Sequence, residues 1–319
     1  MKLNKNIFIC VLLAVMVLFC ISAVSAEDNQ NADLGAVDAS ASSVDLSNVD
    51  IKGSEAQSSL GAGSSSVVTN DTFFNYFDKD GVINKSLTYN ELIFDGEFSG
   101  LGIDTITIDA PITISSENVT VFNNIGFKII SDDVTLTGFD IVKTTEGSAI
   151  TVKGDDVTID DVFIDISSAG KNDTFAIIAV ESDNLQLLNN IIAFNTGSVG
   201  CTAFLHAVDV RGSNNVNIKK NNITVNLPAL TVNWYGAGID QDLPLAIGIQ
   251  DCENVTFAEN NVNAIVKEGN YYDTLDAMMV YGVKNLEITD NNFTETSSLK
   301  TVRCLYAVDL YNFNEATIS

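Results

Sequence analysis

The chain has 319 residues and carries 42 acidic against 16 basic side chains, a net charge of −26 at pH 7. A protein with this much negative charge repels nucleic acid and anionic lipid, which argues against either as a partner. It also attracts divalent cations, but no motif supports a Ca²⁺ site, so we expect a solvated acidic coat and no cofactor.

Residues 1–26 have the layout of a secretory signal peptide. Lys2 and Lys5 give a positive start, residues 7–21 are all apolar, and Val24-Ser25-Ala26 offers small residues for cleavage. The apolar run is shorter than the ~20 residues of a membrane span. We therefore expect a secreted or cell-surface protein with no membrane insertion after cleavage. The alternative is an uncleaved anchor.

Residues 27–71 are rich in Ser, Ala and Asp and contain no aromatic side chain. Such a stretch buries too little apolar surface to offset its ordering entropy, which predicts a disordered linker. Asp71 is predicted to N-cap a short helix that carries Phe73, Phe74 and Phe77. This aromatic segment would cover the first coil of a solenoid.

A repeated unit fills residues 72–319. Its marker is an apolar–polar–apolar triplet, the period of a half-buried strand, preceded in seven of eight cases by Asn or Asp. Asn and Asp tolerate the left-handed backbone of a tight turn. The first two triplets lie closest together, which predicts an irregular N-terminal end. The triplets begin at Val119, Val134, Val157, Leu185, Val216, Val255, Leu286 and Ala316.

Two further strands and a second turn complete the unit. An Ala-led strand such as Ala207–Val210 precedes most triplets, and a strand such as Ile223–Val225 follows them. We predict a right-handed parallel β-helix in which matching residues of successive coils stack. Five positions past the triplet start, we expect a ladder of Asn124, Asn190, Asn221, Asn260 and Asn291. The residues expected to point inward are Val216, Ile218, Val255, Phe257, Leu286 and Ile288.

The Asn-Val-Thr and Asn-Asn units, behind a signal and a Ser-rich linker, resemble the adhesin-like surface proteins of methanogenic archaea. Residues 73–78, with Asp80-Gly81 after them, are similar to the start of the β-helical region of that family. The resemblance covers residues 72–319 and implies a pectin-lyase-like β-helix with a binding or structural role at the cell surface. Family members often continue into further repeats or an anchor. Since the chain stops after its eighth triplet, we expect a truncated C-terminus.

Catalysis is the main alternative, because polysaccharide lyases and glycoside hydrolases share the β-helix. Asp209 and Asp309 are predicted to share an outward position, but they lie too many coils apart to form a catalytic pair. Arg211, flanked by Asp209 and Asp251, is the best candidate for a lyase site. His206 is expected to be a strand or loop residue. We therefore expect a non-catalytic protein, with the enzyme and a purely structural role as alternatives.

Ligand binding has more support, from an insertion at Leu227–Leu245. We expect the inter-strand loops there and in the next coil to bind surface glycans, or proteins of other cells, through aromatic faces and carboxylate acceptors. The alternative is that Trp234 only packs over the side of the helix. The predicted binding residues are Trp234, Tyr235, Asp240, Asp242, Tyr271 and Tyr272.

Two residue types complete the predictions. Asn70, Asn84 and Asn172 begin Asn-X-Ser/Thr sequons away from the turn ladders, which marks them as candidate glycosylation sites. Cys201, Cys252 and Cys304 follow the signal, and an odd trio gives no disulfide framework and no metal-ligand spacing. We expect them to be buried as small apolar residues, with a Cys201–Cys252 pair as the alternative.

Overall fold

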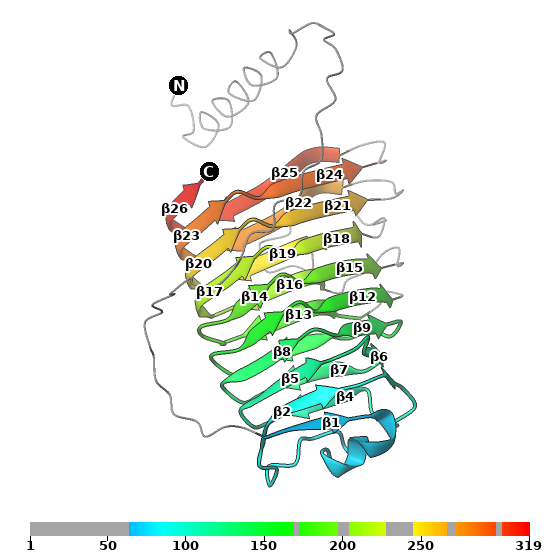
Figure 1. The fold of residues 1–319 in the computed structure, drawn as a ribbon. Coiled ribbons are helices and arrows are strands. Elements are labelled where there is room, and N and C mark those ends of the chain that lie inside the picture. Colours follow the sequence, from blue (N-terminus) through cyan, green and yellow to red (C-terminus); the bar gives the residue numbers. More distant parts are fainter. Residues whose placement is uncertain (1–63, 169–171, 197–203, 228–244, 267–271, 298–301) are drawn as a thin grey trace, which may run out of the picture. The chain divides into compact units, whose positions relative to one another are not determined.

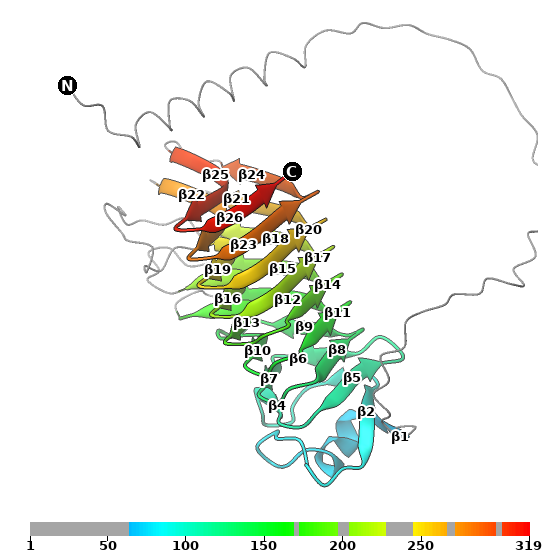
Figure 2. The same cartoon turned by 90° about the vertical axis from the view of Figure 1, so that its left-hand side faces the viewer.

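The computed structural model describes residues 64–168, 172–196, 204–227, 245–266, 272–297 and 302–319. These residues form a parallel β-helix of three sheets (Figure 1), as predicted. Sheet 1 has ten strands, Sheets 2 and 3 have eight each, and each coil runs from Sheet 2 to Sheet 1 to Sheet 3. Sheet 2 is stacked along one side of the helix in Figure 2.

Sheet 1 consists of β1 (Ser64–Val68), β2 (Tyr89–Phe94), β5 (Ile112–Ser116), β8 (Val134–Thr137), β11 (Thr158–Asp160), β14 (Gln186–Leu188), β17 (Asn214–Lys219), β20 (Glu253–Ala258), β23 (Lys284–Thr289) and β26 (Asn314–Ile318). Sheet 2 consists of β4 (Thr105–Ile108), β7 (Gly126–Ile129), β10 (Ile150–Val152), β13 (Thr174–Val180), β16 (Leu205–Arg211), β19 (Leu245–Gln250), β22 (Tyr272–Tyr281) and β25 (Val302–Tyr311). Sheet 3 consists of β3 (Glu97–Phe98), β6 (Val121–Asn123), β9 (Asp140–Lys143), β12 (Phe163–Ser168), β15 (Ile191–Thr196), β18 (Asn222–Leu227), β21 (Asn261–Val266) and β24 (Asn292–Ser297).

The apolar residues of the triplets stack inside the helix. Ile218 pairs with Phe257, which pairs with Ile288 in the next coil, so one apolar column runs through successive strands of Sheet 1. All six residues predicted to point inward are at most 3% exposed. The alternation therefore fixed the register, because a shift of one residue would turn every apolar side chain of a strand to solvent.

The residues before the last seven triplets adopt the predicted left-handed conformation. Their φ angles lie between 54° and 61°, a region that Asn and Asp enter at low cost. Even the exception, Glu315, has a φ of 61°. The residues concerned are Asp133, Asp156, Asn184, Asn215, Asn254, Asn285 and Glu315.

The asparagine ladder lies at the corner between Sheets 1 and 3. The side-chain nitrogen of Asn221 donates to Oδ1 of Asn260 at 3.0 Å, and that of Asn260 donates to Oδ1 of Asn291 at 3.0 Å. Asn190 begins the ladder, and its Oδ1 accepts the backbone N–H of Val162 at 3.0 Å. Asn124 does not belong to it, which corrects one prediction: it lies at the corner between Sheets 3 and 2.

The first triplet was also assigned wrongly. Val119 is 80% exposed and Thr120 is 1% exposed, the reverse of the expected pattern, and Val121 begins β6 in Sheet 3. The Sheet 1 strand of this coil is β5, whose Ile112 pairs with Val134. Alternation together with a preceding Asn was not sufficient here, because a surface turn produced the same short pattern. The predicted irregular spacing therefore comes from this wrong assignment.

The N-terminal boundary differs from the prediction as well. Strand β1 lies inside the stretch predicted to be linker and pairs with β2. Its sequence is mostly serine, and Val68 is its only fully buried residue, so composition did not indicate a strand. The predicted helix is the 3₁₀ helix η1 (Asn70–Asn75), and its N-cap is Thr69 rather than Asp71.

An aromatic cap closes the first coil, as expected. Phe73 and Phe77 stack with ring centroids 4.5 Å apart, and both are at most 2% exposed. Phe77 contacts Phe94, and Phe73 contacts Phe98, the first phenylalanines of the core. Figures 1 and 2 show η1 at the end of the stack, next to β1 and β2. These rings shield apolar surface that the first coil would otherwise expose.

Candidate functional site

All the long insertions of the repeat enter at one corner of the β-helix. This corner, here called the connection edge, is where the chain passes from a strand of Sheet 3 to the next strand of Sheet 2. Residues 228–244 connect β18 to β19, and residues 267–271 connect β21 to β22. The two segments are therefore anchored on neighbouring coils, as the sequence predicted.

Most of the predicted binding residues lie outside the described part of the chain. These are Trp234, Tyr235, Asp240, Asp242 and Tyr271. Tyr272 is the first residue of β22, where its backbone pairs with Val302. The topology thus supports a shared edge, while the expected aromatic surface on it stays a prediction.

A cluster of charged and aromatic side chains lies beside this edge, on the outer face of Sheet 2. Within β16, Val208 and Val210 point into the core, so Asp209 between them points outward. Arg211 holds Asp209 with two hydrogen bonds, from Nε to Oδ1 at 2.7 Å and from its terminal nitrogen to Oδ2 at 2.8 Å. His206 bonds Oδ2 through Nδ1. The sequence placed Asp209 and Arg211 near each other, and it correctly expected His206 in a strand or loop without grouping it with them.

Two phenylalanines surround this charged group. The guanidinium carbon of Arg211 lies 5.0 Å from the ring centroid of Phe204, within the range of a cation–π contact. Phe204 and Phe175 both meet the imidazole of His206 edge to face, with centroids 5.8 Å and 5.7 Å away. We call these five residues the Arg211 cluster: Phe175, Phe204, His206, Asp209 and Arg211.

The missing side chain at Gly248 leaves room for the cluster. Gly248 pairs with Asp209 on the next strand. A Cβ atom there would lie 3.3 Å from Nδ1 of His206 and 3.5 Å from Oδ2 of Asp209. The first of these distances is tighter than an ordinary contact, so a larger residue would press on the hydrogen bond between the two side chains.

The ion pair fixes the charge state of the cluster. Burial by itself would raise the pKa of Asp209, but the hydrogen bonds from His206 and Arg211 outweigh it and hold this pKa below its usual range. The same bond to Asp209 raises the pKa of Arg211. Asp209 is therefore a carboxylate and Arg211 a cation at neutral pH. An arginine held in this way is a poor proton acceptor.

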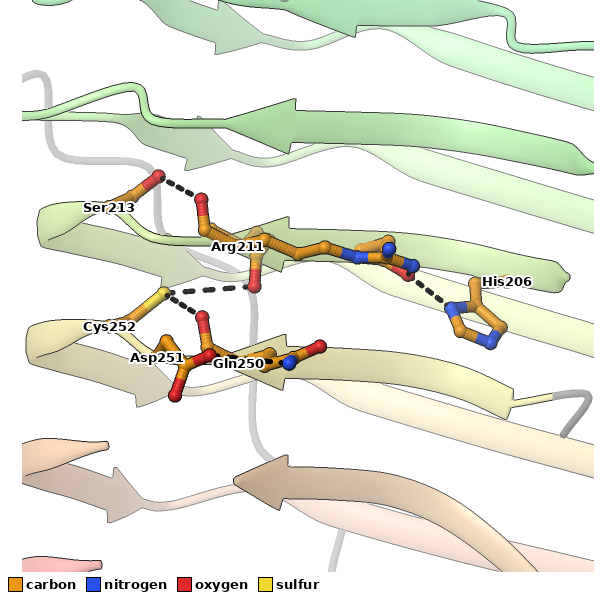
Figure 3. A network of polar contacts seen from close by, with 8 residues as sticks. His206, Arg211, Ser213, Gln250, Asp251 and Cys252 are labelled. Carbon is orange, nitrogen blue, oxygen red and sulfur yellow. Dashed lines mark hydrogen bonds and ion pairs between the residues drawn. The ribbon is translucent and has the colours of Figure 1, made fainter. Parts of the chain in front are cut away.

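The grouping of Arg211 with Asp251, predicted for a lyase, is not seen. Figure 3 shows the guanidinium of Arg211 directed along the strand toward His206, whereas Asp251 lies at the turn beside Cys252. Asp251 accepts a hydrogen bond from the side-chain amide of Gln250 at 3.2 Å. Sequence proximity placed Asp251 near Arg211, but the backbone turn between coils directs the two side chains apart.

A second acidic group, missed by the sequence reasoning, lies farther along Sheet 2. Asp209, Gly248, Met279 and Asp309 share one outward position, as predicted, so the two aspartates are too far apart to act together. Asp276 occupies another position of the sheet, one coil before Asp309, and is 4% exposed. Its Oδ1 has no hydrogen-bond partner among the described residues. The prediction considered a single outward position per strand and therefore overlooked this residue.

The acidic group has an unusual protonation behaviour. Burial raises the pKa of Asp276 to about 7, and the charges of Asp309 and Glu295 add to this. Burial also raises the pKa of Glu295, although its carboxylate accepts the backbone N–H of Ala277 at 3.0 Å. Asp309 is bonded by the hydroxyl of Tyr311 at 2.6 Å. A carboxyl group with a pKa near 7 can serve as a general acid or base, but acidic clusters with a purely structural role show the same rise in pKa.

The remaining predicted residues fall as follows. Cys252 is a buried free thiol, as expected, and burial raises its pKa to about 11. Cys201 and the side chain of Cys304 lie outside the described part of the chain. Asn84 is exposed, Asn70 accepts the backbone N–H of Ser99 at 3.2 Å, and the amide of Asn172 bonds Glu146. Glycosylation at these three sites stays a prediction.

Within the described ranges, no group of three or more His, Cys, Asp or Glu side chains is placed to hold a metal ion. No helix in that part of the chain is long and apolar enough to cross a bilayer.

Comparisons with known proteins add no relative to this picture. No protein-family model matches the chain, and a search of the curated proteins finds no match. The chemistry of the Arg211 cluster therefore has to be judged from its own geometry.

Proposed function

We propose that the protein is exported and binds glycans at the cell surface, without cleaving them, along the connection edge. The observation that carries this proposal is the Arg211 cluster, which places a partly exposed phenylalanine ring and a partly exposed guanidinium beside that edge. An aromatic face can pack on a sugar ring, and a neighbouring planar donor can bond its hydroxyls.

Arg211 has donors to spare for such a ligand. A guanidinium carries about five N–H donors, and Asp209 takes two of them. In the part of the chain that the structure describes, no side-chain hydrogen bond uses the remaining ones. Asp209 also restrains the guanidinium, so little rotamer entropy remains to be lost when a ligand binds. The signal sequence and the resemblance to surface adhesins support the location.

Removing the ring of Phe204 should weaken binding about tenfold or more, as expected for an aromatic contact at the centre of a site. We suggest a glycan array, followed by titration of the best glycan, with wild type and Phe204→Ala. Phe74→Ala is the matched control, because Phe74 is an exposed phenylalanine on the N-terminal cap. A Trp234→Ala, Tyr272→Ala double variant tests the rest of the edge.

Each result has a clear meaning. If Phe204→Ala binds like wild type while the double variant does not, the site belongs to the inserted loops alone. If neither wild type nor any variant binds a glycan, the proposal fails and a purely structural surface role is favoured. Cleavage of a bound polysaccharide would contradict the non-catalytic part and direct attention to Asp276 and Asp309.

A further inference from the structure

A cleft of about 760 Å³ opens on the connection edge near the N-terminal end of the β-helix. It arises because the connections between Sheet 3 and Sheet 2 differ in length from coil to coil. Residues 99–104 connect β3 to β4 and residues 144–149 connect β9 to β10, whereas β6 and β7 between them are joined by residues 124–125 alone. A short connection between two longer ones leaves a gap in the edge, and residues of all three connections line it.

Lys143 lines this cleft from an unusual position. It is the last residue of β9 and pairs with Ile166, a core residue, so it occupies an inward position of Sheet 3. The next residues in this column are Phe194, Val225 and Ala264, all buried and apolar. Lys143 is itself 4% exposed. A lysine is rarely so buried unless it is paired, because a desolvated charge is costly.

In the described part of the chain, however, the ammonium of Lys143 makes no ion pair and no hydrogen bond. Burial lowers its pKa, and the charge of Asp104 opposes this without a direct contact. Lys79, the other lysine of the cleft, is already bonded to Asp80 at 2.7 Å. Lys143 is therefore the cation of the cleft whose charge a ligand can satisfy.

The polar groups around Lys143 limit what can bind. Oδ1 of Asn124 accepts the backbone N–H of Thr144 at 2.7 Å and its hydroxyl at 3.0 Å, which fixes the amide in place and leaves its NH₂ to donate elsewhere. Asp104 and Glu146 supply carboxylates at the same cleft. Carboxylates accept hydrogen bonds from hydroxyls and repel additional negative charge.

We infer that this cleft binds a small hydroxylated monocarboxylic acid, with the ligand carboxylate on the ammonium of Lys143 and its hydroxyls on Asp104 and Asn124. The single buried cation offers one counter-charge. A doubly charged phosphate or sulfate group would face Asp104 and Glu146 with charge left over. This site is separate from the Arg211 cluster and does not depend on the glycan proposal.

The inference can be tested by titrating the purified mature protein with D-gluconate by calorimetry. D-Glucitol is the matched ligand control, because it has the same chain of hydroxyls without the carboxylate. Acetate tests the carboxylate without hydroxyls, and inorganic phosphate tests a dianion. Gluconate should bind at least tenfold more tightly than the other three. Glucitol lacks the carboxylate that pairs with Lys143, acetate lacks the hydroxyls that bond Asp104 and Asn124, and the phosphate dianion is repelled by the carboxylates of the cleft.

Lys143→Met is the matching protein variant, because methionine fills a core position without a charge. It should fold at least as stably as wild type and lose about tenfold or more in gluconate affinity. Lys128→Met, an exposed lysine on neighbouring β7, should bind gluconate like wild type. Gluconate should also protect Lys143, but not Lys128, from an amine-acylating reagent, as read by peptide mass spectrometry.

Three results would overturn the inference. Equal gluconate affinity in wild type and Lys143→Met would show that the ammonium does not hold the carboxylate. Tighter binding of phosphate than of gluconate would show that the cleft prefers a dianion. Absence of gluconate binding to wild type, together with unprotected acylation of Lys143, would show that the cleft is not a site for this class of ligand.

Discussion

Replacing Asn260 with leucine should lower the free energy of unfolding by about 2–6 kcal/mol. The side chain of Asn260 makes four hydrogen bonds. It accepts from the backbone N–H and the amide of Asn221, at 2.9 and 3.0 Å, and it donates to the carbonyl of Ile218 and to Asn291, at 2.9 and 3.0 Å. Leucine would leave two buried backbone groups without a hydrogen-bond partner, the N–H of Asn221 and the carbonyl of Ile218. Each such loss costs about 1–3 kcal/mol.

The adjacent residue provides the control. Asn261 is exposed, and its amide donates to Asn222 at 3.0 Å in a second, outer row of asparagines. Water can replace this bond, so Asn261→Leu should change stability by no more than about 0.5 kcal/mol. Urea unfolding followed by circular dichroism measures both variants. Equal midpoints for wild type and Asn260→Leu would mean that the inner ladder contributes nothing beyond what water supplies.

The repeats of the sequence allowed most of the fold to be predicted. Each coil places the same residue in the same environment, so a pattern that is ambiguous in one coil is confirmed by the next. Val216, Val255 and Leu286 could therefore be placed inside from alternation alone. Val119 was misplaced, because it lies in the turn between β5 and β6, and that turn imitates the triplet pattern of a Sheet 1 strand. The Ser-rich strand β1 was missed for a related reason: its order comes from pairing with β2, which composition does not encode.

The candidate sites were less accessible to sequence reasoning. Asp209 and Arg211 were found together because only Val210 separates them along one strand. Their partner His206 lies three residues before Asp209 on β16, and its role depends on the space left by Gly248 in the next coil. Lys143 was missed entirely, because a lysine at the end of a strand normally points to solvent. A closer reading of the repeat had one usable signal: Lys143 falls in a column whose next members are all apolar.

Asp276→Asn should raise the free energy of unfolding above neutral pH by up to about 4 kcal/mol, the value of a shift of about three pKa units. Burial is the main reason that the pKa of Asp276 lies near 7, with Asp309 on β25 and Glu295 on β24 adding like charge. The folded state thus binds a proton that the unfolded state has released. Between pH 4 and pH 7 the contribution of Asp276 to stability falls as pH rises, and it stays low above pH 7.

Asparagine keeps the shape of the side chain but cannot ionise, so the stability gained over wild type should be large at pH 8 and much smaller near pH 4. Urea unfolding at these two pH values measures the difference directly. Asp290→Asn is the control, because Asp290 is exposed and has a φ of 55°, which asparagine also tolerates. If the difference between Asp276→Asn and wild type is the same at both pH values, Asp276 is not protonated in the folded protein. Its unpartnered Oδ1 would then require a cation or a donor from outside the described residues.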